Sequence, residues 1–184
     1  MNKTRGPQRI PPYEIGGGSD EADVALNGVS KMFGGYVPNI HKVMANSPAM
    51  IEAFEAMRRL LQKTIISAGE REIVSIEVSR RSDCDYCKTA HSHLARRLRI
   101  SEDDVAAALE GRPISDPRLA LVQSATQRLL DRRAKLSDDE LEAFRERGLS
   151  NAELLEIIAV IGWYVMSTYT NNLAQTEIDE IFKD

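Results

Sequence analysis

Helix-start signals recur along the chain from residue 47 onward, and they constrain the fold more than any other feature. Ser47-Pro48 and Asp116-Pro117 each place a capping side chain directly before proline, which is favoured at the first position of a helix. In a capping box, a hydroxyl and an acid three residues later satisfy two free backbone donors. Three segments fit this pattern: Ser101 to Asp104, Ser137 to Glu140 and Ser150 to Glu153. We therefore expect an all-α helical bundle.

Apolar residues recur at helical spacing between these signals. After Ser47 we expect an inward face formed by Phe54, Met57, Leu61 and Ile65. The last long helix, predicted over residues 152–170, is apolar around most of its circumference, so it should be central or lie at a subunit interface. Residues 72–79 partly alternate in polarity as a strand would, but the chain offers no partner strand, and helix is the prediction there.

The length of 184 residues suits a single domain, predicted over residues 19–184. Residues 1–18 hold three prolines and three consecutive glycines, which favours an extended or disordered arm. The net charge of −4 argues against nucleic-acid binding. The most apolar stretch, Leu154 to Val165, is twelve residues long and too short to cross a membrane. With no secretory signal in the first residues, we expect a cytoplasmic protein without a membrane partner.

The segment from Ser82 to His91 carries the chemistry. If a helix begins near Asp83, with that carboxylate as its N-cap, then Cys84, Cys87 and His91 share one face within about 60°. His93 then points to the other side, toward solvent. A close cysteine pair in a reducing compartment indicates a catalytic or metal-binding site more than a structural disulfide.

The spacing suits thiol chemistry. A cysteine thiol with a pKa of about 8.5 is mostly protonated at neutral pH, and a helix N-terminus stabilises its thiolate. His91 can accept a proton from Cys87, and Glu72, on the preceding helix, is the candidate group that orients His91. A thiolate that attacks a peroxide becomes a sulfenic acid, which the second cysteine condenses to a disulfide; an external dithiol must then restore the pair. Spacing alone allows either order of the two cysteines.

Glu72, then eleven residues, then Cys84-x-x-Cys87-x-x-x-His91 resembles the signature of the alkyl hydroperoxidase D and carboxymuconolactone decarboxylase superfamily. More closely, the chain resembles its peroxidase-related branch. The resemblance covers roughly residues 25–178 and includes three further segments: Gly35 to Asn39, Asn46 to Pro48 and Thr170 to Asn172.

The resemblance implies an all-α fold, assembly into trimers or hexamers, and thiol peroxidase activity on a small-molecule peroxide without a cofactor. By position, Cys87 matches the cysteine that forms the sulfenic acid and Cys84 the partner that closes the disulfide. His91 and Glu72 match the proton relay. The decarboxylases of the superfamily generally lack the cysteine pair, so the pair favours the redox branch.

Two further residues are possible accessory groups. Well-known members carry histidine directly before the second cysteine, where this chain has Tyr86. A phenol is a poor base at neutral pH but can donate a hydrogen bond. His41 follows a Pro-Asn turn and could lie near the site, although a capping or surface role fits it too. Asn171 and Asn172 are expected to cap the long helix or bond to a neighbouring helix.

Three alternatives remain open at this point. A metal-binding module could use Cys84, Cys87 and His91, with Glu72 or water as a fourth ligand. A cofactor-free lyase of the decarboxylase type would need His91 and Glu72 but not the thiols. An interaction protein would carry the thiols incidentally.

Overall fold

The computed structural model describes residues 6–183, and all regular secondary structure in this range is helical. Residues 1–5 of the expected arm, and residue 184, lie outside the described range. In chain order the elements are α1 (Asp20–Met32), α2 (Asn39–Met44), α3 (Pro48–Leu61), α4 (Ala68–Arg81), α5 (Asp85–Arg97), α6 (Glu102–Glu110), α7 (Pro117–Arg132), α8 (Asp138–Glu146), α9 (Asn151–Ala174) and the 3-10 helix η1 (Glu180–Phe182). The prediction of an all-α fold is confirmed.

Side-chain caps open the helices where the sequence indicated. The predicted N-caps all accept backbone N–H hydrogen bonds: Ser47, Ser101, Asp116, Ser137 and Ser150. The structure adds a capping box that the sequence analysis did not single out, formed by Ser67 and Glu70 at the start of α4. Residues 72–79 lie inside α4, so the choice of helix over strand there is confirmed.

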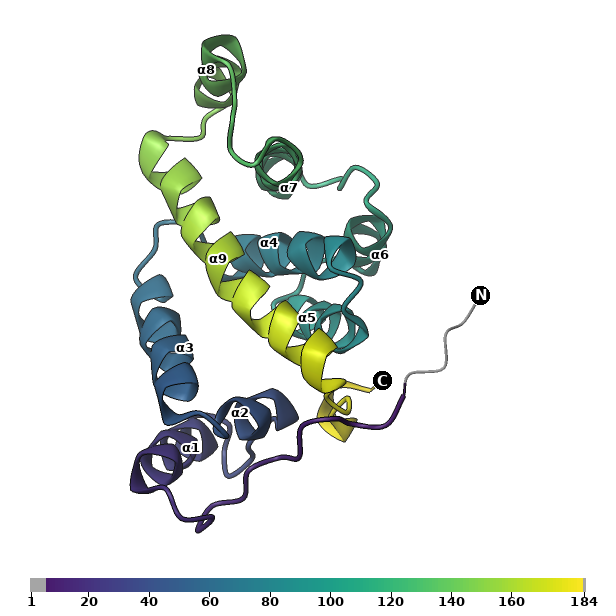
Figure 1. The fold of residues 1–184 in the computed structure, drawn as a ribbon. Helices are drawn as coiled ribbons and strands as arrows, with labels where there is room; N and C mark the ends of the chain where they lie inside the picture. The colour runs from purple at the N-terminus through teal and green to yellow at the C-terminus, as the bar shows by residue number, and fades with distance from the viewer. Residues whose placement is uncertain (1–5, 184) are drawn as a thin grey trace.

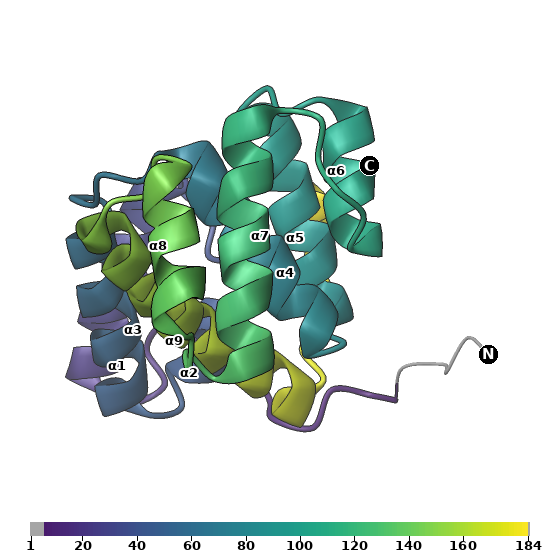
Figure 2. The same cartoon turned by 90° about the horizontal axis from the view of Figure 1, so that it is seen from above.

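Helix α4 is the centre of the molecule. It packs against α5, α6, α7 and α9, and Figures 1 and 2 show it enclosed by these helices. Ile73 and Ile76 belong to an apolar cluster shared with α5, α6 and the α6–α7 connection, whereas Val74 and Val78 belong to a cluster shared with α7, α8 and α9. Because apolar contacts surround α4, it is a rigid support for the side chains of its first turns.

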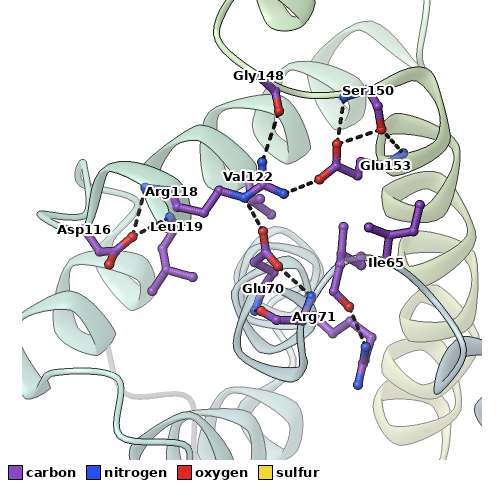
Figure 3. Close-up of polar contacts among 12 residues, drawn as sticks. Ile65, Glu70, Arg71, Asp116, Arg118, Leu119, Val122, Gly148, Ser150 and Glu153 are labelled. Carbon is purple, nitrogen blue, oxygen red and sulfur yellow. Dashed lines mark hydrogen bonds and ion pairs between the residues drawn. The ribbon is translucent and has the colours of Figure 1, made fainter.

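One arginine joins the N-termini of three helices (Figure 3). Arg118, in the first turn of α7, forms ion pairs with Glu70 of α4 and Glu153 of α9. Both acids also close the capping boxes of their own helices, with Ser67 and Ser150. The contacts fix the ends of α4 and α9 relative to each other, and these two helices carry part of the site described below.

The long helix α9 has two different faces. One face contributes Leu154, Ile157, Val160 and Tyr164 to the core. The other exposes large apolar side chains to solvent: Leu155, Ile158, Tyr169 and Leu173. The buried face confirms that this helix is central, and the alternative prediction of a subunit interface stays a prediction.

The apolar length of α9 was underestimated from the sequence. The helix has 24 residues and, with a mean hydropathy of 1.3 over its best window, is long and apolar enough to cross a membrane by composition alone. Its inner face, however, carries the buried polar residues Ser167, Thr168 and Asn171 among the other helices. Protein packing accounts for this face, as in the core helix of a folded domain.

Two segments outside the helices remain to be described, the α3–α4 loop and residues 6–18. Helix α3 ends at Leu61, so Ile65, expected on its inward face, is instead exposed in the α3–α4 loop. Its backbone N–H donates to Glu156 of α9. Residues 6–18 contain no helix and pack against the helices of their own chain (the purple segment of Figure 1). The backbone N–H of Arg9 donates to the carbonyl of Ala174, and that of Tyr13 donates to the carbonyl of Lys42.

Candidate active site

The first turn of α5 holds both cysteines, with a different cap from the one expected. Asp83 has a positive φ of 47° and precedes the helix, so the prediction that its carboxylate caps α5 is wrong. Cys84 is the N-cap, and its Sγ accepts a hydrogen bond from the backbone N–H of Cys87 at 3.3 Å. The sulfur of Cys84 therefore lies at the positive end of α5, which favours a thiolate there.

The two cysteines differ in what they face. Both are thiols and both are buried. Cys87 lines a cavity of about 260 Å³ and Cys84 is not among its lining residues, although both cysteines belong to the same apolar cluster with residues of α1, α2 and α3. Much of the cavity wall is aromatic: Phe33, Phe54, Tyr86, Trp163, Tyr164 and Phe182. A small apolar molecule in this cavity meets the sulfur of Cys87 first.

His91 and Glu72 form the pair that the sequence predicted. Nδ1 of His91 lies 2.7 Å from Oε2 of Glu72, and both side chains are largely buried at the cavity wall. The ring of Tyr164 contacts His91 edge-on, with centroids 4.7 Å apart. Burial, and secondly the charge of Glu72, raise the pKa of Tyr164 well above its ordinary value, so this phenol stays neutral. The carboxylate fixes the imidazole, whose other nitrogen remains for proton transfer.

Asn171 contacts the sulfur of Cys87 directly. Its Nδ2 donates to Sγ of Cys87 at 3.2 Å, from a position on α9 where it is 1% exposed. The sequence indicated an interhelical hydrogen bond or a cap for this residue. Gln175, not Asn171, is the C-cap of α9. Asn172, which follows Asn171, donates to the carbonyl of Ser82, just before the turn that holds the cysteines. A buried amide donor stabilises a thiolate more than a neutral thiol.

Tyr86 lines the cavity, but its hydroxyl is bound elsewhere. It donates to Oδ2 of Asp179 at 2.5 Å, and Tyr36 donates to the other oxygen of the same carboxylate. The backbone N–H of Asn39 also donates to Asp179. Burial, and secondly Asp179, raise the pKa of Tyr86 well above its ordinary value. Tyr86 is thus a neutral hydrogen-bond donor that holds the C-terminal segment over the site.

The other two histidines lie on different sides of the site. His41 is 6% exposed and lines the same cavity as Cys87, so it is neither on the surface nor a cap. His93, expected in solvent, is half-buried and packs its ring against Phe182. The structure thus brings Cys87, His91, Glu72 and His41 to one cavity, and Cys84 bonds to the backbone N–H of Cys87.

The metal-binding alternative finds no support in the structure. Within residues 6–183, no three side chains of His, Cys, Asp or Glu converge in a way that could hold a metal ion. The sulfur of Cys84 caps α5, and Nδ1 of His91 bonds to Glu72.

Two site residues escaped the sequence analysis in whole or in part. The sequence indicated that Asn171 could form an interhelical hydrogen bond, but not that it donates to the sulfur of Cys87. Asp179 was not considered, although an acid in a short segment after the last helix was visible. Their partners lie 84 and 93 residues away along the chain. No local pattern reports such contacts.

Two solved structures share this fold over nearly their whole length. One is an alkylhydroperoxidase D core, an uncharacterized peroxidase-related protein from Ralstonia eutropha JMP134, with a TM-score of 0.83 and 22% identity over 96% of this chain and 95% of that one. The other is an uncharacterized peroxidase-related protein from Silicibacter sp. TM1040, with a TM-score of 0.78 and 21% identity over 99% and 97%. At these identities the likeness shows the fold.

The model of the Carboxymuconolactone decarboxylase family matches residues 47–114, the segment that contains Glu72, Cys84, Cys87 and His91. Over this segment the chain is similar to the Carboxymuconolactone decarboxylase family, and over nearly its whole length it shares the fold of the alkylhydroperoxidase D core. A third structure with the superfamily's fold is the debrominase Bmp8, solved as a cysteine-to-alanine variant with 2,3,4-tribromopyrrole; it has a TM-score of 0.72 and 18% identity over 98% of this chain and 96% of that one. Comparison with curated proteins gives no match.

Proposed function

We propose that this protein is a thiol peroxidase that reduces an organic hydroperoxide or hydrogen peroxide. The observation that carries the proposal is the position of Cys87. Cys87 lines a small apolar cavity together with the His91–Glu72 pair, and Cys84 lies close by, with its Sγ 3.3 Å from the backbone nitrogen of Cys87. Peroxide reduction needs a base, a nucleophile and a second thiol, and His91, Cys87 and Cys84 can supply these three groups.

The cycle balances with the groups present and one external reductant. His91 accepts the proton of Cys87, and the thiolate attacks one peroxide oxygen. The S–O bond forms as the O–O bond breaks, and the leaving oxygen takes a proton and departs as alcohol or water. The Cys84 sulfur then attacks the sulfenic acid of Cys87, water leaves, and a disulfide forms. An external dithiol returns two electrons and two protons. No cofactor enters this cycle, which we assign to the cytoplasm.

The first test counts thiols before and after one equivalent of an organic hydroperoxide, by intact mass. The reduced protein should lose about two mass units and both thiols, and recover them with a dithiol. Cys87→Ser should consume no peroxide. Cys84→Ser should react once and stop at a sulfenic acid on Cys87. Full activity in Cys87→Ser would overturn the proposal, and lactone turnover in a variant lacking both cysteines would indicate the lyase instead.

The aromatic cavity wall supports a second candidate, reductive removal of halogen from an aromatic ring. Phe54 stacks on Trp163 with ring centroids 4.9 Å apart, and a flat ring could lie against such a wall. The thiolate of Cys87 would take the halogen while the ring carbon takes a proton, and Cys84 would then displace halide to give the same disulfide. Halide release from a brominated pyrrole, with no consumption of peroxide, would favour this reading over the first.

A further inference from the structure

A second histidine–glutamate pair lies at the same cavity. His41, on the short helix α2, lines the cavity together with Cys87 and His91. Its ring packs between Phe33 and Phe54, with centroid distances of 5.9 and 5.7 Å. These aromatic contacts hold the imidazole in place and shield it from solvent.

The polar atoms of His41 are not satisfied by the protein. Within residues 6–183 neither ring nitrogen has a partner with hydrogen-bond geometry, although Nε2 lies 3.3 Å from Oε1 of Glu55. Oδ1 of Asn171, a buried atom of another residue that lines the cavity, also lacks a hydrogen-bond partner within residues 6–183. Buried polar atoms without partners are costly, so a polar group that enters the cavity would gain stabilising contacts with these atoms.

Glu55 gives the pair its charge. It is 6% exposed and also binds Nε of Arg58 at 2.8 Å. Burial by itself raises the pKa of Glu55, but the interactions with His41 and Arg58 outweigh burial and hold that pKa below its ordinary value. The Glu55 carboxylate, with Oε1 3.3 Å from Nε2 of His41, orients the imidazole at the cavity wall. The other charged groups at the cavity are Arg71 and the His91–Glu72 pair, on α4 and α5.

We propose that His41, held by Glu55, is a second catalytic acid–base group that protonates the oxygen leaving from a hydroperoxide. This inference rests on the proposed peroxidase function. The Sγ–O bond of the sulfenic acid forms as the O–O bond breaks, and the electron pair of that bond leaves on the outer oxygen. His41 gives that oxygen its proton, so alcohol departs. The proton that His91 took from Cys87 returns to His41 through water, and the protein's proton count is unchanged.

A separate acid has a clear chemical purpose. An alkoxide is a poor leaving group, so O–O cleavage in an alkyl hydroperoxide benefits from protonation in the transition state. The carboxylate that leaves from a peroxycarboxylic acid is stable without that proton. The identity of the leaving group therefore separates the role of His41 from a role in holding Cys87.

The test compares single-turnover oxidation of His41→Asn and the parent protein by tert-butyl hydroperoxide and by peracetic acid. With the alkyl hydroperoxide, the variant should react about 10²-fold more slowly, as is typical for loss of a general acid. With peracetic acid it should react within a few-fold of the parent. Glu55→Gln should show the same selectivity to a smaller degree. His93→Asn, which removes a histidine outside the cavity, should match the parent with both oxidants.

The outcomes separate this inference from the proposed function. Equal losses with both oxidants in His41→Asn, or no loss, would overturn the role of His41 and leave the peroxidase standing. If the parent thiols react with neither oxidant, the proposed function itself fails. His41→Gln, which keeps more of the side-chain volume, repeats the test if His41→Asn does not fold, and the ratio of the two rates decides in either variant.

Discussion

At the scale of single residues, the sulfur of Cys87 is positioned by two helices. Cys87 sits on α5, while the amide that donates to it belongs to Asn171 on α9. A donor to sulfur stabilises the charged form, because a hydrogen bond to an ion is stronger than one to a neutral atom. In an apolar cavity this donor partly replaces the water that a solvated thiolate would have.

Replacement of Asn171 should therefore slow the attack on peroxide. We expect Asn171→Ala to lower the rate of Cys87 oxidation about tenfold, which corresponds to the loss of one hydrogen bond to a charged group. The pH dependence of Cys87 alkylation by iodoacetamide should move to higher pH. Thr170→Val is the matched control, because its hydroxyl bonds only to the carbonyl of Met166 in its own helix. An unchanged rate in Asn171→Ala would show that the amide does not stabilise the thiolate.

The site could be predicted from the sequence only where its members lie close together along the chain. Glu72 and His91 are 19 residues apart on consecutive helices, and their predicted contact is present. The cap of α5 was assigned to Asp83 because carboxylates are common caps, yet a positive φ takes that residue out of the capping position. The contacts of Cys87 with Asn171 and of Tyr86 with Asp179 depend on packing of the whole chain.

At the scale of helices, local rules were sufficient for most starts and failed at some ends. Capping residues set the starts, because free backbone N–H groups need partners whatever the tertiary structure. The end of α3 was placed too late, since Ile65 continues an apolar pattern but contacts the α9 side chain Glu156 through its backbone. The capping box of Ser67 and Glu70 was present in the sequence and, if recognised, would have settled α4 as a helix.

The ion pairs of Arg118 should make folding stability depend on pH. Burial raises the pKa of Glu70 and of Glu153, but hydrogen bonds from serine caps and Arg118 outweigh burial and lower both pKa values. A carboxyl whose pKa is lowered by folding adds stability above its unfolded pKa and loses it as the pH falls. Stability should therefore decline as the pH falls below the ordinary range for glutamate, about 4.3.

A substitution isolates the contribution of this arginine. We expect Arg118→Met to lower the free energy of unfolding by about 1 to 2 kcal/mol near neutral pH, a modest value because the guanidinium is partly exposed. Acidification should then cost the variant less than the parent. Urea unfolding at neutral and acidic pH measures both effects, with the exposed Arg133→Met as control. Equal acid sensitivity in Arg118→Met and the parent would contradict this role.

At the scale of the whole molecule, α9 presents an apolar stripe to solvent. Leu155, Ile158, Tyr169 and Leu173 are all at least 41% exposed and recur at helical spacing along one face. A soluble monomer seldom exposes so continuous an apolar surface. We propose that a second copy of the chain covers this stripe, since apolar helix faces of this kind pair with one another. This agrees with the oligomer expected from the family resemblance.

Charges placed on this stripe should separate the copies. We expect the parent protein to sediment as an oligomer and the double variant Leu155→Glu, Leu173→Glu to sediment as a monomer. Both positions are exposed, so the helical content of the chain should be preserved. A charge reversal at the exposed Lys135 serves as the control and should leave the assembly intact. An oligomer that survives the double variant would place the interface elsewhere.

The cap of α5 is a cysteine, which stabilises a helix start less than the usual capping residues do. On stability grounds alone, serine is among the best residues for that position, and the hydroxyl would accept the same N–H more strongly than sulfur does. The chain nevertheless has sulfur there, buried and bound to the first turn of the helix. Disulfide formation uses that same atom, so each catalytic cycle would pull on the cap and loosen the turn. The first turn of α5 would then be less stable in the disulfide form, and reduction by the dithiol would restore the cap.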